Sequence, residues 1–249
     1  MDTVSIVVAN HGRDLTELVE SIGRSTVKPL ELIVIDEGRE RSWQRNKGIK
    51  QAVGDCIIWL DSDQSISPNL LQECLVRTKN GAKSLYIPEE IIAKSFFGKI
   101  RAFERGFYTG TAVDVQRFVV ANMCPFFNEE LTGPEDADWG RRIHGKKGIT
   151  KSPLYHHDDI GFWDYCKKKA YYTKSMRRYA EMHPSDKCLN PWYRCFGIFT
   201  ENRKWKKLVK HPILSIGVFF IVAVRGVIYL TNRTERSKKC RPLKEWYLL

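Results

Sequence analysis

The sequence predicts an α/β protein in which a mostly parallel sheet is flanked by helices. Three observations lead to this prediction. Over the first hundred residues, short apolar runs alternate with segments of helical periodicity. Turn-forming residues end each apolar run, and no internal repeat interrupts the order. This alternation is typical of βαβ units, which build parallel sheets.

The elements can be placed in chain order from these patterns. We expect strands over residues 5–9, 30–35, 56–60 and 83–87, with helices over 15–22 and 42–53 and a third helix opening at Pro68. Later in the chain we expect a helix over 98–108, a strand over 117–121, a helix over 135–144, a strand over 149–153 and a helix over 162–182.

Polar residues follow the first three predicted strands. Asn10 comes after the first strand, Asp36 after the second, and Asp61 and Asp63 after the third. The carboxyl ends of parallel strands meet at one edge of a sheet, where ligands bind in such folds. The sequence therefore predicts a binding site at this edge.

The charge balance indicates an anionic partner. The 249 residues carry 41 Lys and Arg against 29 Asp and Glu, a formal net charge of +12. Most of the surplus lies from Arg141 onward, around a long apolar stretch. This distribution favours membrane lipids as the partner, and we expect no nucleic acid.

That apolar stretch covers residues 212–230 and contains a single charge, at Arg225. Its length is close to that of a membrane span. Basic residues flank it on both sides, at 203–207 and 233–241, whereas the positive-inside rule allows only one cytosolic flank for a single span. This favours a helix lying along the membrane, while a spanning helix and a buried core helix stay open. We expect a catalytic domain over 1–160 and a helical, basic, membrane-associated region over 161–249.

The N-terminus and the cysteines bear on location. The chain opens directly into a strand-like run without a basic leader, and its seven cysteines are scattered. We therefore expect a reducing compartment, at the cytoplasmic face of the cell membrane.

Two aspartates one residue apart, Asp61 and Asp63, suggest a site for a hard cation, because Mg²⁺ and Mn²⁺ prefer carboxylate oxygens. By itself an Asp-x-Asp pair is more typical of a solvated turn after a strand. The motifs around this pair favour a functional site.

In their order and spacing, these motifs resemble the family 2 glycosyltransferases of the GT-A fold, over about residues 3–160. The resemblance rests on Asn10, Val34-Ile35-Asp36-Glu37-Gly38, Arg45-Asn46-Lys47-Gly48, Asp61-Ser62-Asp63, Gly133-Pro134-Glu135-Asp136-Ala137-Asp138 and His156. It departs from the family in two respects. The second motif reads Asp-Glu-Gly where Asp-Asp-Gly-Ser is commoner, and residues 87–128 match no motif.

The resemblance implies an inverting enzyme with a nucleotide-sugar donor, for which uridine is the family's commonest base. Ala9, Asn10 and Asp36 would line the nucleoside pocket. Arg45 would lie near the diphosphate, and Asp61 would contact the ribose.

The resemblance also implies the chemistry. Asp63 would coordinate Mn²⁺ or Mg²⁺, with His156, or alternatively His157, as a further ligand. Asp136 would be the general base on the acceptor hydroxyl, and Glu135 would help to orient the acceptor. A carboxylate at a helix start is stabilised by the helix dipole, so the assignment of Asp136 is physically reasonable.

Four functions remain open at this stage. The favoured one is transfer of a sugar to a hydroxyl of a lipid-linked or cell-envelope glycan acceptor. A polyprenyl-phosphate sugar synthase would need no strong base at Asp136. A nucleotidyltransferase fits less well, because the loop after the first strand lacks the glycine-rich basic pattern. A non-catalytic membrane scaffold would bind neither metal nor nucleotide.

Overall fold

The computed structural model describes residues 2–38 and 40–239, with side chains as far as Asn232. Within these residues, the strands form two sheets. The larger sheet has the order β2 (Glu31–Ile35), β1 (Val4–Ala9), β3 (Cys56–Asp61), β7 (Gln116–Val120), β5 (Ser84–Tyr86) and β8 (Lys147–Ile149). The smaller has the order β4 (Gln64–Ile66), β9 (Leu154–His156) and β6 (Glu89–Ile91).

The larger sheet is mostly parallel, as predicted. Strand β1 pairs in parallel with both β2 and β3, and its last residue, Ala9, lies opposite Ile35 and Asp61. Strand β7 runs antiparallel to its neighbours β3 and β5. The register brings the carboxyl ends of β1, β2 and β3 to one edge, where the polar residues of the sequence motifs follow.

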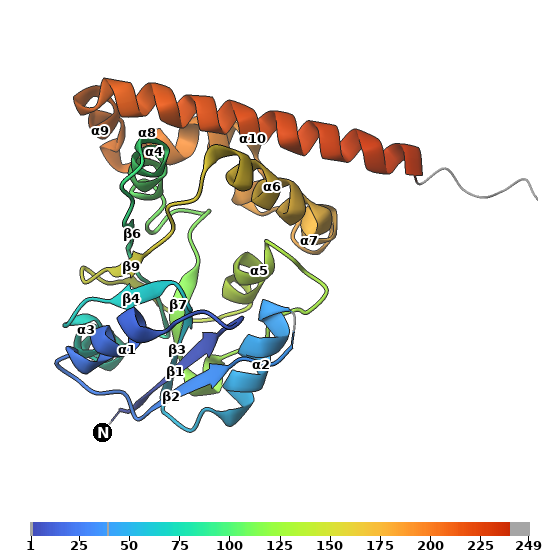
Figure 1. Ribbon diagram of the computed structural model, residues 1–249. Coiled ribbons are helices and arrows are strands. Elements are labelled where there is room, and N and C mark those ends of the chain that lie inside the picture. The colour runs from blue at the N-terminus through green and yellow to red at the C-terminus, as the bar shows by residue number, and fades with distance from the viewer. Residues whose placement is uncertain (1, 39, 240–249) are drawn as a thin grey trace, which may run out of the picture.

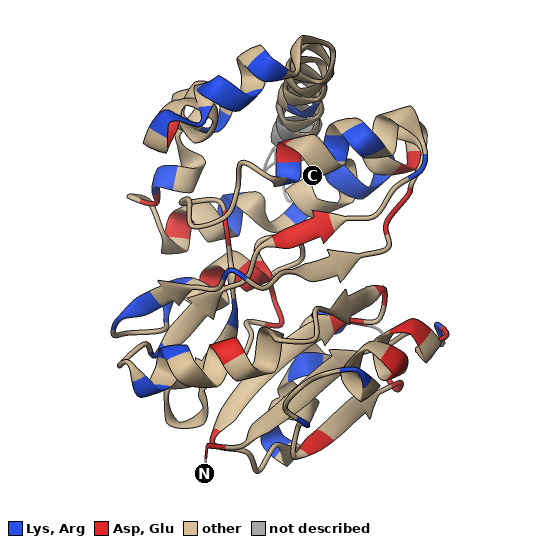
Figure 2. Ribbon diagram, turned by 90° about the vertical axis from the view of Figure 1, so that its left-hand side faces the viewer, with Lys and Arg blue, Asp and Glu red and all other residues tan. Residues whose placement is uncertain are grey.

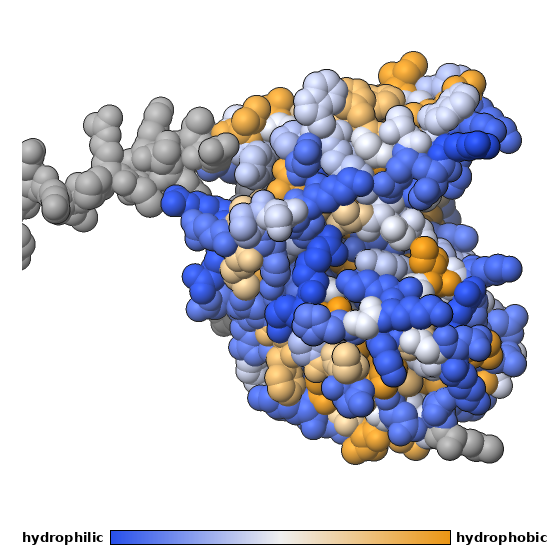
Figure 3. All heavy atoms as spheres, turned by 180° about the vertical axis from the view of Figure 1, so that it is seen from behind, coloured by the Kyte–Doolittle hydropathy of each residue, from blue (hydrophilic) through white to orange (hydrophobic). Residues whose placement is uncertain are grey.

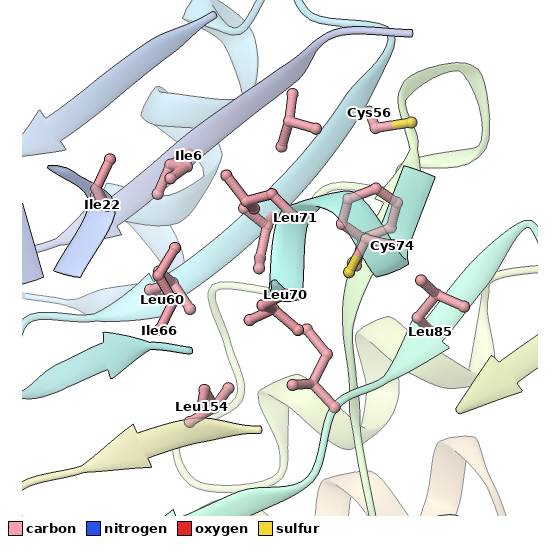
Figure 4. Close-up of a cluster of buried hydrophobic side chains, with 14 of the residues drawn as sticks. Ile6, Ile22, Cys56, Leu60, Ile66, Leu70, Leu71, Cys74, Leu85 and Leu154 are labelled. Carbon is pink, nitrogen blue, oxygen red and sulfur yellow. The ribbon is translucent and has the colours of Figure 1, made fainter. Parts of the chain in front are cut away.

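Helices cover both faces of this sheet (Figure 1). Ile6 and Val8 of β1 pack into one core with helices α1 (Thr16–Gly23) and α3 (Leu70–Lys79), part of which Figure 4 shows. Val7 packs into a second core with α2 (Arg41–Gln51) and α5 (Glu135–Arg141). Because neighbouring residues of a strand point to opposite faces, burial on both sides explains why β1 is apolar except for Ser5.

The three-stranded sheet was not predicted from the sequence. Its strands have three residues each, too few to show an alternating pattern. The sheet matters for the site, because β4 follows the Asp61–Asp63 turn and pairs with β9, where Gln64 lies opposite His156. The expected strand over 149–153 was also misplaced. Strand β8 ends at Ile149, and the next strand begins only at Leu154.

The long helix expected over 162–182 is interrupted. Helix α6 (Phe162–Tyr172) is followed by the 3₁₀ turn η2 (Thr173–Ser175) and by α7 (Met176–Met182). The Ser175 hydroxyl donates to the Thr132 carbonyl at 2.8 Å and accepts from the Thr132 N–H at 2.7 Å. These side-chain bonds to a distant backbone segment hold the turn at this position.

The C-terminal region packs on helix α4 (Phe96–Arg105), which lies before the expected boundary at residue 160. Helix α10 (Pro212–Lys239) runs across α4 and α6 (Figure 1). The remaining short helical segments are η1 (Ala121–Met123), η3 (Lys187–Leu189), η4 (Tyr193–Gly197), α8 (Ile198–Thr200), η5 (Glu201–Arg203) and α9 (Trp205–Lys210).

Helix α10 has one attached face and one exposed apolar face. Arg225 forms an ion pair with Glu104 of α4, and Asn232 donates to the Thr173 hydroxyl at 3.0 Å. By length and composition, the segment Pro212–Asn232 could cross a membrane. In the view from behind, apolar residues lie along the upper margin of the molecule (Figure 3). The exposed apolar residues of the helix are Ile213, Ile216, Phe219, Phe220, Val227, Tyr229 and Leu230. Side chains of the basic flank from residue 233, and Cys240, lie outside the described residues.

Candidate active site

The loop after β1 is fixed by hydrogen bonds from three segments. The Asn10 side chain donates from Nδ2 to Asp36 Oδ1 at 2.6 Å and accepts from the Arg13 N–H at 3.1 Å. Gln44 of α2 donates to the Asn10 carbonyl at 2.6 Å. Asn10 is buried, whereas Asp36 is exposed. The predicted pair Asn10 and Asp36 therefore lies together, with its carboxylate open to solvent at the sheet edge beside Ala9.

Arg45 of α2 is buried beneath this edge. Its guanidinium carbon lies 4.1 Å from the centroid of the Trp59 ring, and its Nη2 lies 2.6 Å from Asp61 Oδ1. Its Nη1 lies 3.7 Å from Glu135 Oε1. The side chain is 1% exposed and does not line the cavity described below. The surrounding rings enclose Arg45, and its expected place near a diphosphate stays a prediction.

Asp61 is held in its ionised form. Its second oxygen, Oδ2, lies 3.4 Å from Arg117 Nη1. Burial by itself would raise the pKa of Asp61, but the positive charges of Arg45, Arg117 and Arg41 outweigh it and hold that pKa well below its usual range. Asp61 is therefore a hydrogen-bond acceptor, suited to a ribose hydroxyl.

Asp63 and His156 face each other across the turn between the two sheets. Asp63 Oδ1 lies 3.3 Å from His156 Nε2, and Asp63 Oδ2 lies 2.5 Å from Arg13 Nη1. The other ring nitrogen of His156, Nδ1, lies 2.8 Å from Glu89 Oε1. Burial would lower the pKa of His156, but the hydrogen bonds to Asp63 and Glu89 outweigh it and raise that pKa to about 9.

These residues fit a divalent cation that takes most of its ligands from water and phosphate. No group of three or more His, Cys, Asp and Glu in the described part of the chain is arranged as a complete metal site. A carboxylate oxygen and an imidazole nitrogen 3.3 Å apart are nevertheless close to the spacing of neighbouring ligands on one ion. Glu89 on the far ring nitrogen matches the carboxylate that commonly orients a metal-binding histidine. His157 instead faces the Ser65 hydroxyl, at 2.9 Å, so His156 is the better placed of the two.

The three acids of α5 have different surroundings. Glu135 is 2% exposed, and its Oε1 lies 3.0 Å from Arg41 Nη2. Burial raises the pKa of Glu135, and the neighbouring charge of Asp136 raises it further. Asp138 is fully buried and bonded to Arg142 and His183. Of the three, only Asp136 lines the cavity. Glu135 does not line the cavity and pairs with Arg41, and its role in orienting the acceptor stays a prediction.

A cavity of about 280 Å³ lies beside part of this site. It extends from the edge of the larger sheet to α4, α6 and α10. Figure 2 shows many lysines and arginines on the helices in the upper half of the molecule. Asp61, Asp136 and His156 line it, which brings together three predicted site residues that are far apart in sequence. Among the described residues, eight Lys and Arg and five Asp and Glu line the cavity. An anionic ligand is therefore favoured.

Three residues of the site were not predicted from the sequence. Arg41 precedes Arg45 by one helical turn, and this spacing could have revealed it as a second cation on the same helix face. Glu89 and Arg117 lie in short strands within the segment that carries no motif. Arg117 Nη2 lies 3.0 Å from Glu89 Oε2, and the two link the aspartate turn to His156.

Comparisons with known proteins agree with this geometry. A model of the family described as glycosyl transferase family 2 matches residues 37–128, which contain Arg45, Asp61 and Asp63. The chain is 24% identical over 196 residues to the "Uncharacterized glycosyltransferase YwdF" of Bacillus subtilis (strain 168), covering 67% of this chain and 68% of that protein.

Solved structures of TarS from S. aureus are also similar to this chain. The 1–349 fragment matches with a TM-score of 0.46 and 13% identity, covering 94% of this chain and 92% of that one. A longer TarS chain matches with a TM-score of 0.48 and 14% identity over 99% of this chain and 56% of that one. Taken with the motifs and the sheet order, the sequence matches show that the chain is similar to the family 2 glycosyltransferases over residues 37–128, and its mixed, mostly parallel α/β fold is of the GT-A type.

Proposed function

We propose that the chain is an inverting glycosyltransferase that moves a sugar from a nucleotide-diphosphate donor to an acceptor hydroxyl, with Asp136 as the general base. One observation carries this proposal. Among the carboxylates that line the cavity, Asp136 alone forms no ion pair with a described residue, and its Oδ1 accepts only from the neighbouring Ala137 N–H, at 2.9 Å. A carboxylate that lines the cavity and has no cation partner is suited to accept a proton from a bound hydroxyl.

The donor lies along the sheet edge in this proposal. Asn10 and Asp36 hold the nucleoside, Asp61 accepts a hydrogen bond from the ribose, and Arg41 and Arg117 face the diphosphate. Both arginines line the cavity, unlike Arg45. UDP-sugars are the donors that the family resemblance favours.

Asp63 and His156 would hold Mn²⁺ or Mg²⁺, which would neutralise charge on the departing diphosphate. Asp136 takes the proton of the acceptor hydroxyl as that oxygen attacks the anomeric carbon. The bond from this carbon to the diphosphate oxygen breaks, and the nucleoside diphosphate leaves with the electron pair. Attack from the face opposite the leaving group inverts the anomeric configuration. Arg41 and Arg117 stabilise the negative charge on the product.

The acceptor is a lipid-linked or cell-envelope glycan at the cytoplasmic face of the membrane. The exposed apolar face of α10 supports attachment to lipid. The ion pair between Arg225 and Glu104 of α4 supports a helix that lies along the membrane surface, because a spanning helix would separate Arg225 from Glu104.

Thermal shift of the detergent-purified protein tests the donor site. Nucleoside diphosphates are added with and without Mn²⁺. We expect one of them to raise the melting temperature only with metal, since a ligand at a hundredfold excess over its Kd stabilises by about 2.7 kcal/mol.

The Asp63→Ala variant should lose this response. Asp164→Ala, which removes a carboxylate with a 71% exposed side chain on α6, should keep it. A folded wild-type protein that responds to no nucleotide contradicts the proposal and favours the scaffold function.

A further inference from the structure

The inner end of the cavity, next to the proposed donor site, is built by α4, α6 and α10. Arg101 and Glu104 reach it from α4, Lys168 and Lys169 from α6, and Arg225 from α10. The proposed mechanism uses none of these residues.

The carboxylates at this end are already committed to arginines. Arg101 Nη2 lies 2.8 Å from Asp158 Oδ2, and Arg225 pairs with Glu104. Lys168 Nζ lies 3.7 Å from the same Asp158 oxygen. Together with Lys169, four cations therefore surround the carboxylates of Asp158 and Glu104. When all six groups are ionised, this end of the cavity has two more positive charges than negative ones.

Lys169 is the cation left over. It forms no ion pair or hydrogen bond within the described residues, and it contacts aromatic rings instead. Its Nζ lies 5.3 Å from the centroid of the Tyr165 ring and 5.9 Å from that of Tyr172. Burial and the positive charge of Arg225 lower the pKa of Lys169 to about 7. A buried lysine that has a lowered pKa and no carboxylate partner is stabilised in its charged form when an anion binds beside it.

Tyr165 provides an independent second observation. The residue is 2% exposed and lines the cavity, yet its hydroxyl has no hydrogen-bond partner among the described residues. A buried hydroxyl without a partner costs free energy, so such groups commonly mark a place where a ligand or water binds. The Arg101 guanidinium carbon lies 5.5 Å from the centroid of the same ring. The unused hydroxyl and the unpaired lysine thus belong to one side chain cluster.

We propose that this cluster binds a phosphate group of the acceptor, with Lys169 and the Tyr165 hydroxyl as its donors. A phosphate dianion matches the surplus of two positive charges. The cluster adjoins the donor end, because the Tyr172 ring that contacts Lys169 also lies 5.4 Å from the Arg41 guanidinium carbon. Resting on the proposed function, the inference narrows the acceptor class to molecules that carry a phosphate, either a lipid-linked one or a soluble phosphorylated glycan.

Calorimetric titration with inorganic phosphate in EDTA tests the cluster without metal-dependent donor binding. We expect the wild-type protein to bind phosphate, and Lys169→Met to weaken binding about tenfold or more. Tyr165→Phe should also weaken it while leaving the melting temperature unchanged or higher. Lys167→Met removes the same charge from the same helix at an 80% exposed position and should bind phosphate like wild type. Phosphate binding that is equal in wild type and Lys169→Met, or absent from both, overturns the proposal.

Two further measurements identify the phosphate source and separate this proposal from the donor site. Co-sedimentation uses phosphatidylcholine vesicles with and without polyprenyl phosphate. If polyprenyl phosphate increases the sedimented fraction and Lys169→Met abolishes this increase, the phosphate is lipid-linked. Phosphate binding without such an increase in sedimentation indicates a soluble phosphorylated glycan. In the thermal shift with nucleoside diphosphates and Mn²⁺, Lys169→Met should respond like wild type. Loss of that response would instead place Lys169 in the donor site and overturn the assignment to the acceptor.

Discussion

Arg45 of α2 and Asp61 at the end of β3 form a buried ion pair, with Nη2 2.6 Å from Oδ1. The guanidinium also lies 3.7 Å from Glu135 of α5 and stacks on Trp59. One side chain thus connects the sheet edge with the helix that carries Asp136. Arg45 of the sequence motif therefore has a structural role, because it fixes the positions of the aspartate turn and of the helix that carries the proposed base.

Replacing Arg45 with Met should destabilise the protein strongly. The change leaves the Asp61 and Glu135 carboxylates with fewer cations in a buried site, and removing one partner of a buried ion pair costs about 3–5 kcal/mol. Urea unfolding measures the loss. Arg24→Met breaks an exposed pair with Glu20 and should cost less than about 1 kcal/mol. Equal losses for the two variants would contradict the structural role of Arg45.

Asp136 and Asp138 lie on the same helix and should give opposite results on conversion to Asn. Asp136→Asn should lower kcat by about a hundredfold or more while the melting temperature and nucleotide binding stay unchanged, since the side chain makes one local hydrogen bond. Asp138→Asn should mainly lower the melting temperature, because its carboxylate is buried between Arg142 and His183. Transfer assays and thermal melts of both variants make the comparison.

The Asp136→Asn variant also separates two acceptor chemistries. A phosphate acceptor is already anionic and needs no base, so a polyprenyl-phosphate sugar synthase should tolerate Asp136→Asn. Activity within a few fold of wild type in that variant would contradict a hydroxyl acceptor and favour the synthase.

Much of the fold followed from the sequence because its central strands are buried on both faces. Apolar runs such as those around Ile6 and Ile58 are easily recognised when turn residues bound them. The β4, β6 and β9 strands were missed, since three residues carry too little pattern. Their pairing depends on contacts between segments about ninety residues apart, such as Gln64 with His156.

The site was predictable where a motif carried it. Asn10 and Asp36 meet as expected, and Asp61, Asp136 and His156 line one cavity. Burial of Arg45 under aromatic rings was not visible in the sequence, because it depends on Trp59 and Phe127 from separate segments. The roles of these residues in catalysis stay predictions that the experiments address.

Asp186 should make stability sensitive to acid. It accepts hydrogen bonds from Arg141 Nε at 2.7 Å, from the Tyr179 hydroxyl and from the Cys188 N–H at 2.9 Å. Burial would raise the pKa of Asp186, but the hydrogen bonds from Arg141 and Tyr179 outweigh it and lower that pKa. A carboxyl with a lowered folded-state pKa stabilises the fold above its unfolded pKa, about 3.9, and loses this contribution as the pH falls below it.

Urea unfolding of wild type and Asp186→Asn at pH 6 and pH 3 measures that contribution. The difference in unfolding free energy between the two proteins should be larger at pH 6 than at pH 3. Asp164→Asn, with its 71% exposed side chain, should show little difference at either pH. A difference in unfolding free energy that is the same at pH 6 and pH 3 would mean that the Asp186 carboxylate does not stabilise the folded state through its charge.

The exposed face of α10 should bind lipid while the helix stays docked on the catalytic unit. Ile216 is 72% exposed and Phe220 56% exposed, so Ile216→Glu with Phe220→Glu should abolish sedimentation with anionic vesicles at little cost in stability. Val76→Glu on α3, a 50% exposed position far along the chain, should leave sedimentation unchanged.

The orientation of α10 can be tested in the membrane-bound protein, because the Asn232 amide bonds to the Thr173 hydroxyl only when the helix lies on α6 and η2. Cysteines at these two positions should crosslink on mild oxidation in the vesicle fraction if α10 lies along the surface. A spanning helix would carry one of its ends away from the catalytic unit. Crosslinking that occurs in detergent but is lost on vesicles would therefore show that α10 leaves its place on insertion, and would overturn the in-plane orientation.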